Sequence, residues 1–195
     1  MLFNTTDYLL IILLGFSVFY DLKQKRIPNF LTFPAMLLGL FIYTFNGGWS
    51  GFLQGFAGFG IGIAVFFIPF ALGGMGAGDV KLMGAIGALK GLEFILYTTV
   101  FTALLGGIMA LAILFLKGQL YTSIKKGLLM VAVPFFTVLY LRLRSPYFKN
   151  LSVYYSIKLE AIQEHHTKRI YLPYGVAIAI GALIVLSDVF PKLIL

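Results

Sequence analysis

The chain has 195 residues, of which 60% are hydrophobic and 11% are charged, a composition that excludes an ordinary soluble globular protein and indicates a membrane protein. Its net charge of +8 does not indicate nucleic-acid binding, because the basic residues fall between apolar segments, where membrane topology places them. Because the chain contains no Cys, it can form no disulfide, no thiolate-bound zinc site and no cysteine nucleophile.

Six apolar segments follow in chain order, and each is predicted to be a membrane-spanning helix. The first lacks a basic start and a small-residue cleavage site, so we predict a retained span and not a removed signal peptide. The fourth is only about 20 Å long at 1.5 Å per residue, which is short for a hydrocarbon core of about 30 Å. The segments are residues 5–20, 30–46, 52–73, 79–91, 92–116 and 170–190.

The third segment carries glycines on one helical face. Gly51, Gly55, Gly58 and Gly62 follow one another at spacings of three and four residues. Small residues in this pattern let membrane helices approach closely. We therefore predict that this face packs tightly against a neighbouring helix.

Residues 127–141 are ambiguous, because they are apolar but short for a span and contain Pro134. If they do not cross the membrane, thirteen of the 15 Lys and Arg residues lie inside and only Lys90 and Lys192 lie outside. If they cross and residues 79–91 turn back, the split is the less favourable eleven against four. The count favours the first arrangement.

The predicted fold is therefore an all-α integral membrane protein of the cell membrane, with six spans and both termini outside. Residues 1–195 form one membrane-embedded domain, with residues 117–169 as a cytoplasmic insertion. Aromatic and basic residues mix in this insertion, which is typical of interfacial helices lying on anionic lipid.

Five of the seven acidic residues have an ordinary explanation at a surface. In the predicted topology three are solvated helix-end carboxylates on the outside, and two lie among basic residues on an exposed amphipathic helix, where surface ion pairs are expected. They are Asp7, Glu93 and Asp188, followed by Glu160 and Glu164.

Asp21 and Asp79 remain. Asp21 ends the first span and Asp79 opens the fourth, so both are expected at the same cytoplasmic depth. Asp21 alone can be read as a solvated loop acid, and Asp79 alone as the N-cap of its helix. The glycine-rich residues 73–78 distinguish Asp79, because irregular backbone at membrane depth is tolerated only where it is buried in protein or lines a wet cavity.

Two adjacent carboxylates suit peptide hydrolysis, because like charges a few ångströms apart share one proton. The ionised member activates water, and the protonated member polarises the carbonyl and assists the leaving amine. Lys81 is read as an interfacial anchor and not as a catalyst. No metal site or cofactor is predicted, since the adjacent His165 and His166 point about 100° apart on a helix.

Three motifs resemble those of the type IV prepilin peptidase family. Residues 76–83, Gly-Ala-Gly-Asp-Val-Lys-Leu-Met, resemble its Gly-x-Gly-Asp-x-Lys-Leu motif. Residues 20–29, which contain Asp21 and end in Arg-Ile-Pro-Asn, resemble its first-aspartate motif. Residues 172–181, Leu-Pro-Tyr-Gly followed by apolar residues, resemble the start of its last helix. The resemblance covers residues 5–116 and 170–190 but not the insertion.

The resemblance implies a role for each matched position. Asp21 and Asp79 correspond to the catalytic aspartates, and Gly76 and Gly78 to the glycines that position the second. The remaining matched positions would shape the loop after Asp21 or bring the last helix to the same face. They are Pro28, Asn29, Lys81, Pro173, Tyr174 and Gly175.

The resemblance also implies an active site facing the cytoplasm and a prepilin or pilin-like substrate with a basic leader before a hydrophobic helix, as in type IV pilus assembly and protein secretion. Larger family members carry a zinc-binding domain and methylate the new N-terminus. This chain resembles the short form, so peptidase activity without methyl transfer is expected. The sequence does not predict an oligomeric state.

Two other readings remain open. Presenilin-like intramembrane proteases share the Gly-x-Gly-Asp signature, but their first aspartate lies within a span, whereas Asp21 is followed at once by basic residues. A small transporter could use Asp21 and Asp79 for proton coupling. Internal repeats would favour a transporter, and none is evident.

Overall fold

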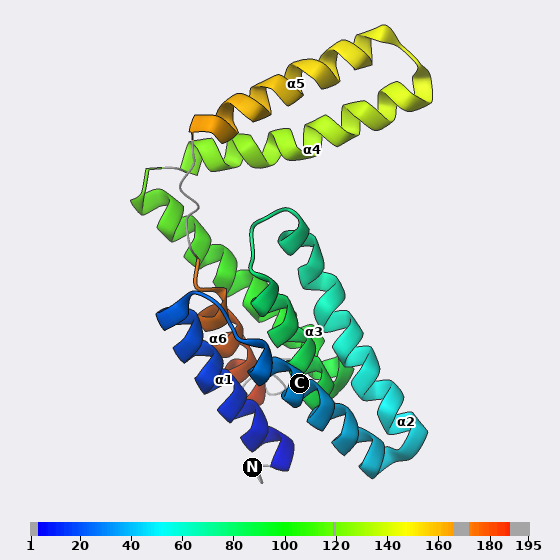
Figure 1. The fold of residues 1–195 in the computed structure, drawn as a ribbon, viewed down its shortest axis with the longest axis vertical. Coiled ribbons are helices and arrows are strands. Elements are labelled where there is room, and N and C mark those ends of the chain that lie inside the picture. The colour runs from blue at the N-terminus through cyan, green and yellow to red at the C-terminus, as the bar shows by residue number, and fades with distance from the viewer. Residues whose placement is uncertain (1–3, 119, 166–171, 188–195) are drawn as a thin grey trace, which may run out of the picture. The chain divides into compact units, whose positions relative to one another are not determined.

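The structure, a computed structural model, describes residues 4–118, 120–165 and 172–187 (Figure 1). All regular secondary structure in these residues is helical, which confirms the all-α prediction. Four helices, α1 to α4, are long and apolar enough to cross a membrane, as expected of a multi-pass membrane protein. The helices are α1 (Thr5–Gln24), α2 (Asn29–Ala71), α3 (Ala77–Leu116), α4 (Leu120–Leu143), α5 (Pro146–His165) and α6 (Tyr174–Leu186).

Two of the helices are interrupted by a single glycine. Gly48 in α2 has φ 56° and Gly91 in α3 has φ 80°, so each helix consists of two rods joined by a sharp turn. Positive φ is readily adopted only by Gly. Rods therefore occur at the first five predicted segments, and α6 covers the described part of the sixth. Residues 170–171 and 188–190 of that last segment lie outside the described residues.

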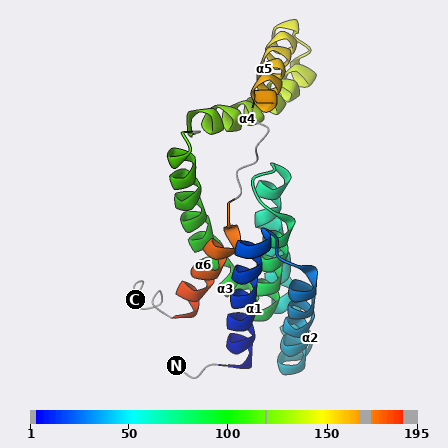
Figure 2. The ribbon, with the colours of Figure 1, turned by 60° about the vertical axis from the view of Figure 1, so that its left-hand side comes forward.

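The chain forms two compact units. The first comprises Met1–Met109 and Leu172–Leu195, and the second Ala110–Tyr171. In the first unit α6 lies beside α1, as both views show (Figures 1 and 2). Its core contains fully buried Leu10, Met83 and Ile178 from α1, α3 and α6. The second unit contains the end of α3 and an antiparallel hairpin of α4 and α5 (Figure 1).

The glycine face of α2 packs closely on its neighbours, which confirms the prediction of close helix approach: Gly58 and Gly62 face the backbone of α3, while Gly51 and Gly55 face Tyr43 in the first rod of α2. Gly51, Gly55, Gly58 and Gly62 are all buried. A Cβ added at Gly58 would lie 2.7 Å from the carbonyl carbon of Gly91, and one at Gly62 would lie 2.8 Å from that of Met83. Only glycine fits these positions at the observed spacing of the two helices.

Replacing Gly58 with Ala is expected to destabilise the first unit by about 1–3 kcal/mol, because the backbone of α3 must move. A Cβ at Gly60, on the same helix, meets no atom within 4 Å, so Gly60→Ala is the matched control. Thermal unfolding in detergent measures both variants. Equal midpoints for Gly58→Ala and Gly60→Ala would contradict the packing described.

The prediction that Asp7 is a solvated surface carboxylate is wrong. Asp7 is only 7% exposed, and its carboxylate pairs with the ammonium group of Lys90 from α3. Its second oxygen accepts a hydrogen bond from the Asn4 N–H at 2.7 Å, which caps α1. A predicted topology gives the depth of a carboxylate in the membrane but does not show which helix packs beside it. Here the neighbouring helix is α3, and its Lys90 supplies the cation.

Replacing Lys90 with Met is expected to destabilise the first unit by about 3 kcal/mol, because it leaves a buried carboxylate without its cation. Asp7→Asn in the same chain should recover part of the loss. Lys149→Met, which removes an exposed lysine of α5, is the control. If Lys90→Met unfolds at the wild-type temperature, the ion pair has no structural role.

Candidate active site

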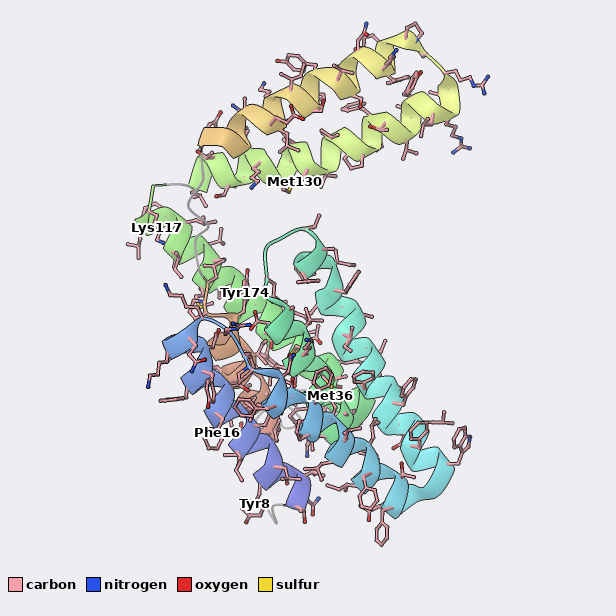
Figure 3. The ribbon with its side chains drawn as sticks, in the orientation of Figure 1. Tyr8, Phe16, Met36, Lys117, Met130 and Tyr174 are labelled. Carbon is pink, nitrogen blue, oxygen red and sulfur yellow. The ribbon has the colours of Figure 1, made fainter. Side chains whose placement is uncertain are left out.

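The predicted site residues lie in the first unit, at the end of α1 and at the beginnings of α2, α3 and α6. Contacts link these four elements directly. They run from α1 to α6, from α3 to the loop after α1, and from α3 to α2. Figure 3 labels Tyr174 at this end of the first unit.

Asp21 is buried at the last turn of α1 and is only 3% exposed. Its Oδ2 accepts a hydrogen bond from the Gly175 N–H at 2.9 Å, and Gly175 is the second residue of α6. The first N–H groups of a helix have no partner within it and favour a negative charge. The solvated-acid reading of Asp21 is therefore wrong, and α6 holds this carboxylate in place.

Gly175 is required at this contact. A Cβ there would lie 2.7 Å from Asp21 Oδ2 and 3.0 Å from Asp21 Cβ. Pro173 is the N-cap of α6. Because proline has no backbone N–H, it leaves no donor without a partner at the start of this helix. The Pro-Tyr-Gly sequence thus begins α6 directly against Asp21.

Asp79 is buried in the first turn of α3 and is 7% exposed. It is the third residue of the helix and not the predicted N-cap. Its Oδ2 accepts a hydrogen bond from the Gly76 N–H at 3.1 Å, while its own N–H bonds the Gly76 carbonyl at 3.2 Å. Its Oδ1 is buried and has no hydrogen-bond partner among the described residues.

The two carboxylates come from distant parts of the sequence and lie close enough for their charges to interact. The hydroxyl of Tyr174, at the start of α6, also lies within electrostatic range of Asp79. The ring of Tyr174 packs where Gly106 of α3 leaves room, since a Cβ at Gly106 would lie 3.2 Å from Tyr174 Cε1. Tyr174 is half-buried at this place.

Gly78 brings the loop after α1 against α3. A Cβ at Gly78 would lie 3.1 Å from the backbone N and O of Ile27, and Ile27 itself is 5% exposed. The role of Ile27 was not predicted from the sequence. The available indication was that Ile27 is a single apolar residue directly after the basic Lys25 and Arg26. Gly76 and Gly78 therefore have different roles. The Gly76 N–H donates a hydrogen bond to the Asp79 carboxylate, and Gly78 lets the loop that contains Ile27 pack against α3.

Lys81 connects α3 to the start of α2. Its Nζ donates a hydrogen bond to Asn29 Oδ1 at 2.9 Å and lies 5.3 Å from the centre of the Phe33 ring. Pro28 is the N-cap of α2 and has extended backbone angles. From the sequence, Lys81 was interpreted as an anchor at the membrane interface. The structure shows that it also binds the Asn29 side chain, which holds the end of the loop between α1 and α2.

No group of three His, Cys, Asp or Glu residues that could hold a metal ion occurs in the described ranges. His166 of the His165-His166 pair lies outside those ranges. The site consists of two carboxylates, the backbone N–H groups that orient them, and a nearby tyrosine.

Residues 8–111, more than half of the chain, match the type IV leader peptidase family. The chain belongs to the type IV leader peptidase family. The match includes Asp21 and Asp79 and ends within α3, so α4, α5 and α6 lie outside it.

Three curated relatives are each described as a prepilin leader peptidase/N-methyltransferase. The protein from Vibrio cholerae is 37% identical over 83 residues, which cover 40% of this chain and 33% of that protein. The Xanthomonas campestris protein is 32% identical over 106 residues, covering 51% and 37%, and the Neisseria gonorrhoeae protein is 29% identical over 108 residues, covering 52% and 37%. The chain therefore spans only about a third of the length of each of these relatives. No solved structure matches the chain significantly.

Proposed function

We propose that this protein is a membrane aspartic endopeptidase that removes the leader peptide of a prepilin or pilin-like protein at the cytoplasmic membrane face. The observation that carries the proposal is that Asp21 and Asp79, from two different helices, are both buried and lie within electrostatic range of each other. Family membership and relatives described as prepilin leader peptidases support the choice of substrate.

The proposed reaction uses both carboxylates. Two like charges in a buried site cannot both ionise easily, so the pair holds one proton. The ionised carboxylate takes a proton from water, whose oxygen attacks the scissile carbonyl carbon. The protonated carboxyl donates to the carbonyl oxygen, and as the C–N bond breaks a proton passes to the leaving amine.

The hydrogen bonds at the site orient both carboxylates. Each aspartate has one oxygen held by a backbone N–H at the beginning of a helix, Asp21 by Gly175 and Asp79 by Gly76. Asp79 Oδ1 is buried and has no hydrogen-bond partner in the described part of the chain, so in the proposed reaction it is the oxygen left to bind water or substrate. Because the two groups titrate as a pair, acid and base are not assigned to one residue each.

The proposed topology has six spans, formed by α1, the two rods of α2, the two rods of α3, and α6. Helix α4 is long and apolar enough to cross, but α5 packs along it and carries Lys149 and Glu160 as exposed residues. A spanning α4 would draw these charges into hydrocarbon, which is costly. Placing the hairpin outside the bilayer core leaves thirteen of the 15 Lys and Arg residues on the cytoplasmic side.

The surface next to Asp21 is basic, with Lys23, Lys25 and Arg26 all exposed. A basic leader would be repelled by this surface. We therefore propose that the hydrophobic helix of the substrate, and not charge pairing with its leader, provides specificity.

The test is cleavage of a purified prepilin by the protein in proteoliposomes, followed by mass spectrometry of the product. We expect one cut between the basic leader and the hydrophobic helix. A cut inside the hydrophobic helix would instead support a presenilin-like protease. Proton movement across the vesicle without cleavage would support a transporter.

A further inference from the structure

One face of α4 has no partner within the described residues of the α4–α5 hairpin. Helix α4 contacts α5 through buried Leu129, through Phe136, whose ring stacks on Tyr155 at 5.4 Å, and through Thr137, whose Oγ1 lies 2.8 Å from Ser152 Oγ. These contacts hold the two helices antiparallel (Figure 1).

Six apolar side chains follow one another on the other face of α4 at spacings of three and four residues, so they form a single stripe. Each is between 59% and 71% exposed. At about 100° per residue, this stripe points away from the face that contacts α5. We call it the α4 stripe: Ile124, Leu128, Val131, Phe135, Val138 and Leu141.

Charge is arranged around this stripe in a regular way. Lys125 and Lys126 lie near the start of α4 and Arg142 and Arg144 at its end, while residues 127–141 contain no charged residue. A helix with an apolar face and basic ends fits the boundary between anionic headgroups and acyl chains when it lies flat.

Helix α5 covers α4 from the opposite side and has a more polar outer surface. Its exposed residues include Lys149, Asn150 and Glu160, and also the apolar or aromatic Tyr147, Val153, Tyr154 and Ile157. The charged groups of α5 belong in water, and the uncharged α4 stripe belongs in an apolar medium. The two surfaces face opposite ways across the hairpin.

We propose that the α4–α5 hairpin lies flat on an anionic membrane surface, with the α4 stripe in the acyl-chain boundary and α5 on the water side. The proposal rests on the topology above, in which α4 does not cross. The charge pattern favours lipid over a protein partner, because basic residues at both ends of an uncharged stripe complement a uniformly anionic plane.

The chain contains no Cys, so single cysteines can be labelled uniquely. We would place a fluorescent label at Val131→Cys on the α4 stripe and at Asn150→Cys on α5 as the matched exposed control. Each variant is reconstituted in phosphatidylglycerol vesicles and in phosphatidylcholine vesicles. Aqueous iodide, and nitroxide lipids labelled near the headgroup or near the bilayer centre, are the quenchers.

In phosphatidylglycerol we expect iodide to quench the Val131 label roughly tenfold less than the Asn150 label, because the stripe leaves water. The headgroup-proximal nitroxide should quench Val131 more than the central one. In phosphatidylcholine the difference between the two sites should shrink, since the electrostatic attraction is lost.

Three outcomes would overturn the proposal. Equal iodide quenching at both sites in phosphatidylglycerol would show that the stripe lies in water. Strongest quenching of Val131 by the central nitroxide would show that α4 spans. Protection of Val131 from both lipid and aqueous quenchers would show a protein partner or a second copy. Prepilin cleavage by the same samples is measured separately, so failure of the lipid contact is distinguishable from failure of the proposed peptidase activity.

Discussion

Replacing Asp79 with Asn is expected to lower the rate of prepilin cleavage by about 10⁴-fold, because in the proposed reaction this carboxyl group both holds and transfers a proton. The amide of Asn has nearly the same shape and still accepts a hydrogen bond from the Gly76 N–H. The fold should therefore be retained. Cleavage is measured by the amount of mature pilin formed in proteoliposomes.

The control for Asp79→Asn is Glu93→Gln, which removes an exposed carboxylate from the same helix. Glu93→Gln should cleave at the wild-type rate. If Asp79→Asn retains activity within about tenfold of wild type, general acid–base catalysis by this residue is excluded.

Replacing Gly175 with Ala is expected to lower the cleavage rate by about 10²-fold, since a misplacement of the order of 1 Å in a reacting group has effects of this size. The new methyl group would lie 2.7 Å from Asp21 Oδ2. Either the carboxylate or the beginning of α6 must then move, and the hydrogen bond from the Gly175 N–H is weakened. Asp21 remains present, so this variant tests its position and not its identity.

The control for Gly175→Ala is Gly15→Ala in α1, the helix that carries Asp21. A Cβ at Gly15 meets no atom within 4 Å, so activity and thermal stability should be unchanged. Wild-type cleavage by Gly175→Ala would mean that contact between α6 and Asp21 is not needed for the reaction.

The sequence predicts the candidate site from the positions of its residues along the apolar segments. Asp21, Asp79 and Gly175 each lie at the end of an apolar segment, and ends on one side of a membrane can meet. The glycines around Asp79 further indicated close approach of backbone. The Ile27 contact with Gly78 shows that the approach involves the loop after α1.

What the sequence could not predict are contacts between side chains on neighbouring segments. Asp7 and Lys90 are far apart in the sequence, so no local pattern indicated that they pair. Hydrogen bonding of Lys81 to Asn29 likewise depends on how α3 sits beside α2. Helix α3 begins at Ala77, two residues earlier than predicted, so Asp79 lies within the helix and not before it.

The ambiguity of residues 127–141 illustrates the same limit. Length and composition allow α4 to cross a membrane, and counting basic residues only favours the alternative. Packing against α5 supports the proposed topology, because a crossing α4 would draw the charged residues of α5 into hydrocarbon. This contact between two helices is not evident from the sequence of either helix alone.

Cooperation between the two aspartates is tested most directly by a double-mutant cycle on prepilin cleavage with Asp21→Asn, Asp79→Asn and both together. Residues that act as one unit lose nearly the same activity singly and in combination. We therefore expect all three variants to cleave at the same residual rate. Losses that multiply in the double variant, or full activity in either single variant, would contradict the proposed aspartate pair.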